Sequence, residues 1–421
     1  MTITMLTTGT RGDTQPFVAL GVALQDAGYP VRIAAAENFA SFVTGYGLEF
    51  YPTRGDIARV ATSAAAADAR QADNPLKFMR SLRHKAFRQL LVDLQADFYA
   101  ASAGAQAIVY HPGAAIGYFI AQQQQIPSIL AAPFPMTPTR EYPALLFYHW
   151  PRLGKWFNYL THKIFTRGFW SVVSGPVKTF WQQQFGQLPA GFGPPYGQQT
   201  TRRRPTVISL SEHVFPRPDD WPAHVHSDGY WFLDAAPDWT PPDDLQAFLQ
   251  AGDPPVYIGF GSVGDPQTKA ETTALALDAL QRTGRRGILA SGWQGMAENP
   301  DIPGTVYLLE SAPHSWLFPR MAVVVHHGGA GTTAAGLRAG VPSVIIPHGN
   351  DQFAWGRRVQ ELGVGPEPVP WKKLTAGKLA AAIQQALADD VVKTARDLGG
   401  WIRTEKGTTV ARQVIIDSLA A

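Results

Sequence analysis

Three short glycine-containing segments in this sequence combine residue types that bind phosphate or move protons. Residues 9–13 read GTRGD, residues 259–264 read GFGSVG, and residues 326–333 read HHGGAGTT. In the third segment, small residues let backbone N–H groups approach an anion, and a helix that follows directs its positive N-terminal dipole to the same place. Thr332 and Thr333 add hydroxyl donors. We therefore expect residues 326–333 to bind a phosphate group.

The adjacent His326 and His327 have two interpretations. His327 can donate a charge-assisted hydrogen bond to a phosphate oxygen. Alternatively, both are strand-end histidines that bond to the backbone. A shared metal is disfavoured because neighbouring residues of a strand point to opposite faces. The small residues beside the pair favour phosphate binding.

Two acids near these segments are either helix caps or functional groups. Asp13 precedes Thr14, Gln15 and Pro16, where a cap is plausible, but a carboxylate there can also take a proton from an attacking hydroxyl. General-base help of this kind is typically worth ~10²–10⁴ in rate. Asp351 and Gln352 follow an apolar run and open another helical pattern. They are a cap or a carboxylate–amide pair that holds sugar hydroxyls.

The segment GFGSVG fits the dinucleotide fingerprint G-x-G-x-x-G, so an oxidoreductase must be considered. That fingerprint needs an acid about 20 residues on, at the end of the next strand, to bind the ribose. Here the next apolar run leads into Ala290, Ser291, Gly292 and Trp293. The absence of an acid at this place disfavours a nicotinamide or flavin enzyme.

Apolar runs that alternate with helical patterns must position these segments. We expect helices at residues 16–27 and from Asn74 to about Gly104. Alternating strands and helices predict βαβ units with parallel sheets, in which ligands bind where strands lead into helices. The expected strands are residues 2–7, 31–35, 48–51, 107–110, 126–132 and 206–210 in the first half, and 256–260, 287–290, 305–309, 322–326 and 341–346 in the second.

The predicted fold class is α/β, with two Rossmann-like domains facing across a cleft. A length of 421 residues suits two or three domains. We assign residues 1–228 to the first domain, 229–244 to a linker rich in Pro, Asp and Trp, and 245–405 to the second domain. Residues 406–421 are predicted to form a C-terminal helix that crosses back to the first domain.

Residues 141–181 contain 12 aromatic side chains among 41 residues, and Glu141 is the single acid beside five basic residues. One interpretation is an inserted helical hairpin that packs its rings into the core. The other is an apolar acceptor mouth or a membrane-surface face. The two are compatible. The candidate acceptor-binding residues in this segment are Tyr142, Phe147, Trp150 and Trp170.

Composition excludes several classes of function. The formal net charge of +3 is too small for a nucleic-acid coat, and the lack of cysteine excludes disulfides, thiolate zinc sites and cysteine nucleophiles. The N-terminus has no basic segment followed by an apolar one, and no run of 18 apolar residues occurs. We expect a cytoplasmic protein, with a peripheral membrane contact as an open alternative.

At these residues the sequence resembles the nucleotide-sugar glycosyltransferases of the GT-B fold. The most similar branch contains the sterol 3-β-glucosyltransferases and the antibiotic aglycone glycosyltransferases. The matching stretches are residues 9–20, 256–262, 312–319 and 326–352, and the last is the most specific. The resemblance implies that the first domain binds the acceptor and the second binds the nucleotide sugar.

The resemblance also implies a role for individual residues. Asp13 matches the general base, and Asp351 and Gln352 match the pair that holds sugar hydroxyls. Ser311 stands where plant relatives stack a tryptophan on uracil, so we expect Trp293 or Trp316 to stack instead. The other matches are Thr10 and Arg11 along the donor pyrophosphate, Ser262 near the β-phosphate, Ser311, Ala312 and His314 around uracil and ribose, and His327, Ala330, Gly331 and Thr332 in the diphosphate loop.

The implied activity is inverting transfer of a hexose, glucose from UDP-glucose, to a hydroxyl of an apolar acceptor such as a sterol. Transfer from a TDP- or UDP-sugar to a polyketide, macrolide or peptide aglycone stays open. A non-catalytic nucleotide-sugar-binding protein is a further alternative, which the presence of Asp13 disfavours. The chain has no D-x-D motif, so we expect no bound metal and no cofactor besides the UDP-sugar co-substrate.

Overall fold

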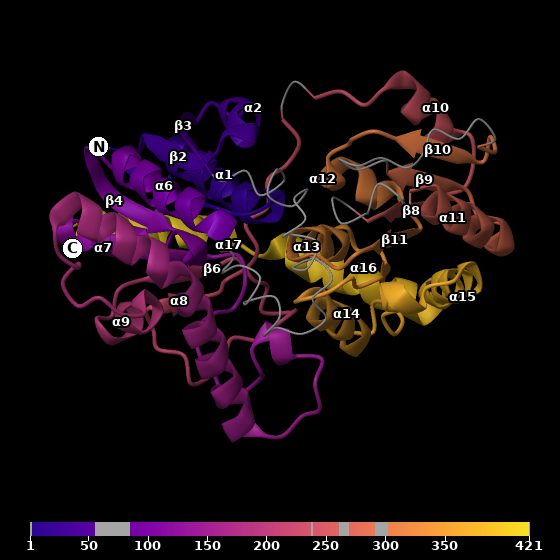
Figure 1. The fold of residues 1–421 in the computed structure, drawn as a ribbon. Coiled ribbons are helices and arrows are strands. Elements are labelled where there is room, and N and C mark those ends of the chain that lie inside the picture. Colours follow the sequence, from indigo (N-terminus) through magenta and orange to yellow (C-terminus); the bar gives the residue numbers. More distant parts are fainter. Residues whose placement is uncertain (1, 55–84, 237–238, 261–268, 291–301, 421) are drawn as a thin grey trace. The chain divides into compact units, whose positions relative to one another are not determined.

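The structure is a computed structural model, and it describes residues 2–54, 85–236, 239–260, 269–290 and 302–420 (Figure 1). Contacts within the chain divide it into two compact units. The first unit comprises Met1–Leu233 and Glu405–Ala421, and the second comprises Asp234–Thr404. The junction at residues 233 and 234 falls inside the stretch assigned above to a linker.

Among the described residues, the first unit has a seven-stranded parallel sheet in the order β3-β2-β1-β4-β5-β6-β7. The central strands β1 and β4 are buried along most of their length because helices cover both faces of a parallel sheet. The strands are β1 (Thr2–Leu6), β2 (Val31–Ala36), β3 (Glu49–Thr53), β4 (Ala105–Tyr110), β5 (Ser128–Ala132), β6 (Thr206–Ile208) and β7 (Val225–His226).

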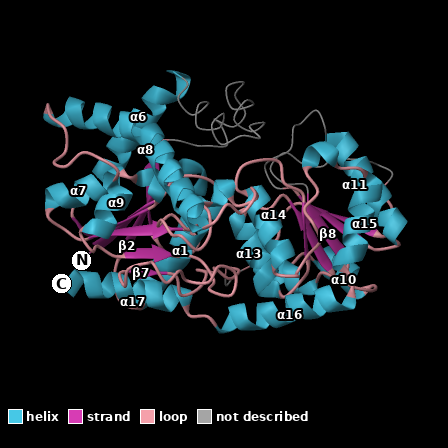
Figure 2. Ribbon diagram, turned by 90° about the horizontal axis from the view of Figure 1, so that it is seen from below, coloured by secondary structure: helices cyan, strands magenta, loops and turns pink. Residues whose placement is uncertain are grey.

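Helices cover both faces of this sheet (Figure 2). One face carries α1 (Arg11–Asp26), η1 (Glu37–Phe39), α2 (Ala40–Thr44) and α17 (Gly407–Ala420). The other carries α6 (Lys85–Ala101), η2 (Pro112–Ala114), α7 (Ile116–Gln124), α8 (Lys155–Phe185) and α9 (Pro195–Thr201). In α17, Ala411 and Ile415 share a core with Phe17 and Leu20 of α1. The last helix therefore packs on the unit that begins the chain.

The second unit has, within its described part, a five-stranded parallel sheet in the order β10-β9-β8-β11-β12. This order repeats that of the first five strands of the first unit. The elements are β8 (Val256–Gly259), β9 (Gly287–Ala290), β10 (Val306–Leu309), β11 (Val323–His326), β12 (Ser343–Ile345), α10 (Asp243–Gln250), α11 (Lys269–Thr283), α12 (His314–Leu317), η6 (Phe318–Arg320), α13 (Ala330–Ala339), α14 (Gln352–Glu361), η7 (Trp371–Lys373), α15 (Ala376–Ala386) and α16 (Asp389–Thr404).

In both sheets, the first strand of the unit neighbours its fourth strand, β1 beside β4 and β8 beside β11. From each such pair the chain winds outward in opposite directions. Ligands of open parallel sheets bind beyond the carboxyl ends of strands at this switch point. The predicted α/β class with two Rossmann-like sheets is confirmed, and the topology gives each unit one preferred place for a ligand.

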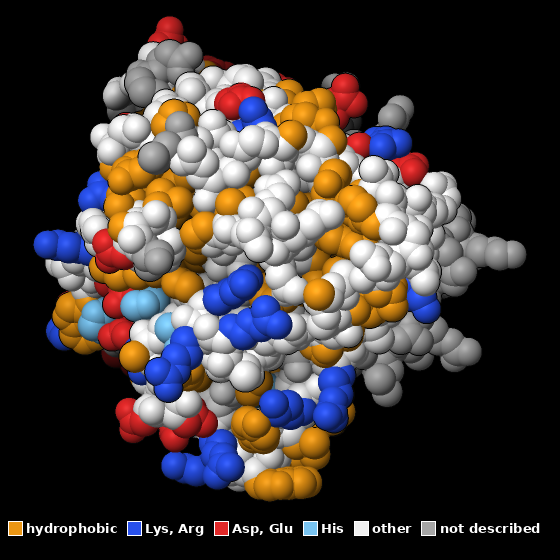
Figure 3. Space-filling view, turned by 90° about the vertical axis from the view of Figure 1, so that its left-hand side faces the viewer, with side chains coloured by type: hydrophobic (Ala, Val, Ile, Leu, Met, Phe, Trp, Pro, Cys, Tyr) orange, Lys and Arg blue, Asp and Glu red, His pale blue; other side chains and the backbone are white. Residues whose placement is uncertain are grey.

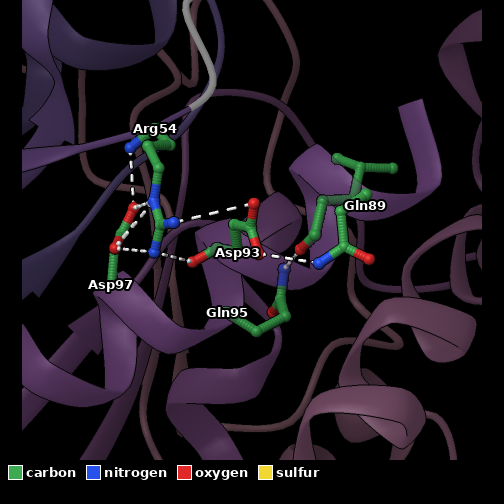
Figure 4. Close-up of polar contacts among 6 residues, drawn as sticks. Arg54, Gln89, Asp93, Gln95 and Asp97 are labelled. Carbon is green, nitrogen blue, oxygen red and sulfur yellow. Dashed lines mark hydrogen bonds and ion pairs between the residues drawn. The ribbon is translucent and has the colours of Figure 1, made fainter. Parts of the chain in front are cut away.

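The end of β3 is held to α6 by an arginine (Figure 4). The guanidinium of Arg54 binds the carboxylate of Asp97 through two nitrogens, and the backbone N–H of Arg54 donates to the same carboxylate at 2.7 Å. Asp93 lies 3.6 Å from the guanidinium. This bidentate pair fixes α6 against the edge of the sheet.

Several expectations were wrong in detail. The helix expected at residues 16–27 begins five residues earlier, at Arg11. The expected helical hairpin at 141–181 is a short turn, η3 (Leu145–Phe147), followed by the single 31-residue helix α8. Strand β7 was not expected, because its two residues are too few for a pattern. The expected start of the helix at Asn74 lies outside the described residues. None of the described helices combines the length and the hydropathy that a membrane crossing needs.

Candidate active site

Asp13 lies in the first turn of α1, at the carboxyl end of β1. Its Oδ2 accepts hydrogen bonds from the backbone N–H of Thr10 at 2.7 Å and from the Thr10 hydroxyl at 3.0 Å. Thr10 is the N-cap, so the two residues form a capping box. This arrangement lets the helix start before Pro16, which lies inside it and leaves one carbonyl without its helical N–H. The capping role expected for Asp13 is real, but it occupies only one carboxylate oxygen.

The other oxygen of Asp13 faces a histidine that the sequence analysis missed. His111 follows β4, and its Nε2 lies 3.5 Å from Asp13 Oδ1. Its Nδ1 accepts the N–H of Gly113 at 3.1 Å, which places the ring proton on Nε2, toward Asp13. The rings of Phe17 and Phe134 pack edge-on against the imidazole and fix its plane. The pairing of β1 with β4 is the feature that indicates a position for His111 beside Asp13.

The surroundings of Asp13 keep it ionised. Burial raises the pKa of Asp13, but hydrogen bonding and electrostatic attraction from His111 and the Thr10 donors together outweigh burial. The pKa is therefore below that of an ordinary aspartate. The side chain is still 26% exposed, and among the described residues Oδ1 has only the long contact with His111. Asp13 is a charged carboxylate with one oxygen open to a proton.

The packing around Asp13 restricts which residues can replace Gly9. Gly9 has a φ of +130°, and a Cβ placed there would collide with the Asp13 carboxylate. Arg11 lies with its guanidinium over the ring of Phe42, 4.6 Å from the ring centre, and its Nε donates to Gln15 at 3.3 Å. Gly9 is thus required for both its backbone conformation and its lack of a side chain.

The second candidate site is the turn from β11 into α13. The helix begins at Ala330 with Gly329 as its N-cap, and Gly328 has a φ of +88°. The first N–H groups of a helix have no partner within it, so those of Ala330, Gly331 and Thr332 can bind an anion. The hydroxyl of Thr333 was expected to do so as well, but it is buried and donates to the Gly329 carbonyl at 2.9 Å.

The histidine pair divides between the two interpretations. His326 is fully buried, and its Nδ1 accepts the N–H of Gly328 at 3.1 Å, as a strand-end histidine would. His327 lies at the mouth of the turn, and burial lowers its pKa to about 4. Its ring is therefore neutral at pH 7, and the charge-assisted bond expected above requires an anion that raises this pKa.

The segment expected around the base and ribose is partly described. Ser311 is exposed, Ala312 is half-buried, and the ring of His314 stacks on Phe318 at 4.2 Å. The guanidinium of Arg320 lies over Trp316, 4.2 Å from the ring centre, so one face of this tryptophan is covered. Ser262 and Trp293 lie outside the described residues.

Asp351 and Gln352 stand at the start of α14. Asp351 occupies the N-cap position, but its Oδ2 accepts the indole N–H of Trp355 at 3.1 Å and makes no capping bond. The side-chain amide oxygen of Gln352, Oε1, accepts the N–H of His348 at 2.8 Å and that of Gly349 at 3.3 Å. Because its oxygen closes this turn, Gln352 has its NH₂ group left to offer to a hydroxyl.

The aromatic residues proposed for the acceptor fall into two groups. The ring of Phe147 packs edge-on against Trp150, and that of Tyr142 packs against His162 and Phe215. Trp170 instead packs with Phe119 and Phe192 beside α7. The described residues contain no group of three His, Asp or Glu side chains that could hold a metal ion.

Two family models match the chain. Residues 3–143 match the glycosyltransferase family 28 N-terminal domain, and residues 275–406 match the domain described as erythromycin biosynthesis protein CIII-like, C-terminal domain. A sterol 3-beta-glucosyltransferase of Arabidopsis thaliana is 35% identical over 97% of this chain and 66% of its own length. One of Aspergillus clavatus is 34% identical over 99% of this chain and 30% of its own length.

Solved structures agree on the fold. The kitacinnamycin glycotransferase has a TM-score of 0.70 and 19% identity, with 99% of this chain and 98% of that chain covered. The calicheamicin glycosyltransferase CalG4 has a TM-score of 0.68 and 16% identity, with 100% and 98% covered. The chain has the fold of these glycosyltransferases, and its first part matches a glycosyltransferase family 28 domain. The chain spans just under two thirds of the length of its plant relatives and less than a third of its fungal ones.

Gly9→Ala should disturb Asp13, whereas Gly28→Ala should not. Both glycines have a positive φ, but nothing lies within 4 Å of a Cβ at Gly28. We expect both variants to lose stability through backbone strain of about 1 kcal/mol, and Gly9→Ala to lose more because its methyl displaces the carboxylate. Thermal unfolding of the two purified variants measures this difference. Equal melting temperatures would contradict the placement of Asp13 against Gly9.

Proposed function

We propose that this protein is a glycosyltransferase that transfers glucose from UDP-glucose to the hydroxyl of a sterol, with inversion at the anomeric carbon. The observation that carries this proposal is the 35% and 36% identity, over nearly the whole chain, to two proteins named sterol 3-beta-glucosyltransferases. Because the chain covers only part of those relatives, their activity is an inference for it. The ionised Asp13 supports a catalytic protein over one that only binds nucleotide sugars.

In this proposal each unit supplies one half of the chemistry. Asp13 Oδ1 takes the proton of the acceptor hydroxyl while the hydroxyl oxygen forms a bond to the anomeric carbon of the sugar. The bond from that carbon to the diphosphate breaks, and the electron pair leaves with UDP. The backbone N–H groups of Ala330 and Gly331, at the start of α13, and the His327 ring would stabilise the growing negative charge. Asp351 and Gln352 would hold sugar hydroxyls.

His111 positions the base in the same scheme. Its Nε2–H faces Asp13 Oδ1, and its Nδ1 is tied to the backbone, so the imidazole does not itself reach the acceptor proton. A low pKa makes Asp13 a weak base, so proton transfer accompanies the formation of the new bond rather than preceding it. The proposal needs no metal, since the charge of the leaving group is met by N–H donors.

A natural-product aglycone is the second candidate acceptor. The C-terminal family model is named after an erythromycin biosynthesis protein, and the similar solved structures are antibiotic glycosyltransferases. Two other similar solved structures, those of the glycosyltransferases SsfS6 and VinC, are complexes with thymidine diphosphate. A TDP-sugar donor and a polyketide or macrolide acceptor would fit this second candidate.

The direct test offers UDP-glucose and TDP-glucose to the purified protein with a panel of sterols, macrolides and polyketide aglycones. We expect one hexose to be added to a sterol, from UDP-glucose, and a β-linked product by the anomeric proton coupling. Mass spectrometry and NMR read these outcomes. Transfer to aglycones only, or from TDP-glucose only, would favour the second candidate, and an α-linked product would exclude inversion.

Asp13→Asn should lower kcat by about 10²–10⁴-fold with little change in UDP-glucose affinity. The amide oxygen can still accept the Thr10 hydrogen bonds, so the start of α1 is preserved while the base is lost. Kinetics with a saturating sterol and calorimetric titration of UDP-glucose separate the two effects. Unchanged kcat would remove Asp13 from the catalytic role.

His111→Asn should shift the acid limb of kcat/KM to higher pH. The carboxylate is the active form, so activity falls as the pH drops through the pKa of Asp13; His111 lowers that pKa, and its removal raises it. Loss of a hydrogen bond to a charged group should also cost about tenfold in kcat/KM at neutral pH. The matched control is His226→Asn, since His226, the last residue of β7, lies 4.0 Å from Asp228. An unmoved limb in His111→Asn would contradict this coupling.

UDP-glucose should bind more tightly as pH falls from 8 to 5, because its diphosphate raises the pKa of His327 from about 4. Because binding takes up one proton, the affinity for UDP-glucose rises by at most about tenfold per pH unit. This rise occurs at pH values below the pKa that His327 has in the complex. The diphosphate diester does not titrate in this range, so calorimetric titrations report on the protein. His327→Gln should remove the dependence. His162→Gln in the first unit is the control, since burial also lowers the pKa of His162 to about 4 and its removal should leave the dependence in place.

A further inference from the structure

In the first half of α8, polar side chains are buried and apolar side chains are exposed. Three of its polar side chains, Asn158, Thr161 and His162, are buried, whereas Trp156 is 75% exposed and Ile164 is 40% exposed. A helix that faces water on one side turns its apolar side chains to the core and its polar ones outward. The opposite arrangement here needs an explanation.

The buried polar side chains are held by the backbone of the preceding loop. Asn158 donates to the Arg140 carbonyl at 2.9 Å, and Thr161 accepts the N–H of Ala144 at 2.9 Å. His162 Nε2 lies 3.0 Å from the Tyr142 carbonyl oxygen. These three contacts fix the rotation of the helix about its axis. The outward position of Trp156 and Ile164 is therefore set by the fold.

The loop before α8 extends the same apolar surface. Among the described residues, seven large hydrophobic side chains are exposed, and four of them lie within residues 150–164. The loop contributes Trp150, 40% exposed, and Leu153, 65% exposed. Single exposed hydrophobic side chains are ordinary, but a contiguous group on a soluble face marks an interaction surface.

Basic residues surround this surface, and acids are absent from a long stretch of sequence around it. Residues 142–211 contain eight Lys or Arg and no Asp or Glu. The whole chain has a net charge of +3, so the rest of the sequence carries five more acids than bases. Arg152 lies over the ring of Tyr148 at 4.1 Å, and Lys163 over that of Tyr159 at 4.9 Å. Cations are thus held beside the apolar side chains.

We name this surface the α8 tip. Figure 3 shows hydrophobic and basic side chains interleaved at the lower end of one face, where Figure 1 draws the start of α8. Its apolar members are Trp150, Leu153, Trp156 and Ile164, and its basic members are Arg152, Lys155, Lys163 and Arg167.

We propose that the α8 tip docks on the surface of a lipid bilayer that contains anionic phospholipids. Tryptophan favours the interface between headgroups and acyl chains, and Lys and Arg side chains favour anionic headgroups. Leu153 and Trp156 enter the interface, and Arg152, Lys163 and Arg167 lie at headgroup level, whereas Lys155 pairs with Glu141 at 3.3 Å. Docking of a second copy is opposed by charge, because two α8 tips would bring like charges together.

Docking is tested by sedimentation with vesicles of phosphatidylcholine alone and of phosphatidylcholine with 30% phosphatidylserine. We expect at least tenfold more protein on the anionic vesicles and a loss of binding as salt is raised. Leu153→Ser with Trp156→Ser, and separately Lys163→Glu with Arg167→Glu, should each weaken binding at least tenfold. Trp401→Ser is the matched control, because Trp401 is 56% exposed on α16 of the second unit and should not matter.

The absence of native cysteine allows a direct probe of insertion. Leu153→Cys carrying an environment-sensitive fluorophore should shift its emission to shorter wavelength on anionic vesicles, and Trp401→Cys with the same label should not. Equal vesicle binding by the α8 tip variants, or an unshifted Leu153 label on bound protein, would overturn the proposal. So would a dimer in sedimentation velocity that the α8 tip variants dissociate. These outcomes do not depend on transferase activity.

Discussion

The Asp13 carboxylate must stay charged although most of its side chain is removed from water, and the first unit is arranged around that requirement. Donors from two strand ends hold it, the Thr10 N–H and hydroxyl after β1 and the His111 imidazole after β4. These groups meet because β1 and β4 are neighbours in the sheet, although about a hundred residues separate them in sequence. The Gly9 backbone makes the space in which the carboxylate fits. The pairing of β1 with β4 therefore determines both where Asp13 lies and that its carboxylate is ionised.

The second unit uses the same topology for another purpose. His326 ends β11 as His111 follows β4, and in both rings Nδ1 accepts an N–H two residues further on. In the first unit, the Nε2 atom of the His111 ring faces the Asp13 carboxylate. In the second, His326 is fully enclosed, and the following turn presents glycine backbone and the first N–H groups of α13. One strand-end geometry thus supports an acid in one unit and an anion cradle in the other.

The sequence predicted the strands and the glycine turns because short apolar runs and glycine clusters are local signals. It failed where the deciding contact is distant. His111 has no motif of its own and gains meaning only from the pairing of β1 with β4. The start of α1 differs from the prediction because proline is typical of a first turn, whereas the Thr10–Asp13 capping box starts the helix earlier and leaves Pro16 inside it. The polar face of α8 looks exposed in sequence, but Asn158 and His162 are buried against loop carbonyls that no pattern reveals.

The return of α17 to the first unit has a consequence for the order in which the molecule forms. Ala411 and Ile415 complete the core that Phe17 and Leu20 begin. A ribosome that has passed Leu233 has made the whole sheet of the first unit but not the helix that covers part of its face. Asp234–Thr404, by contrast, is one continuous stretch that can fold as soon as it emerges. The half that is synthesised first is therefore the half that is finished last, and its uncovered apolar face is where nascent chains would need protection by chaperones.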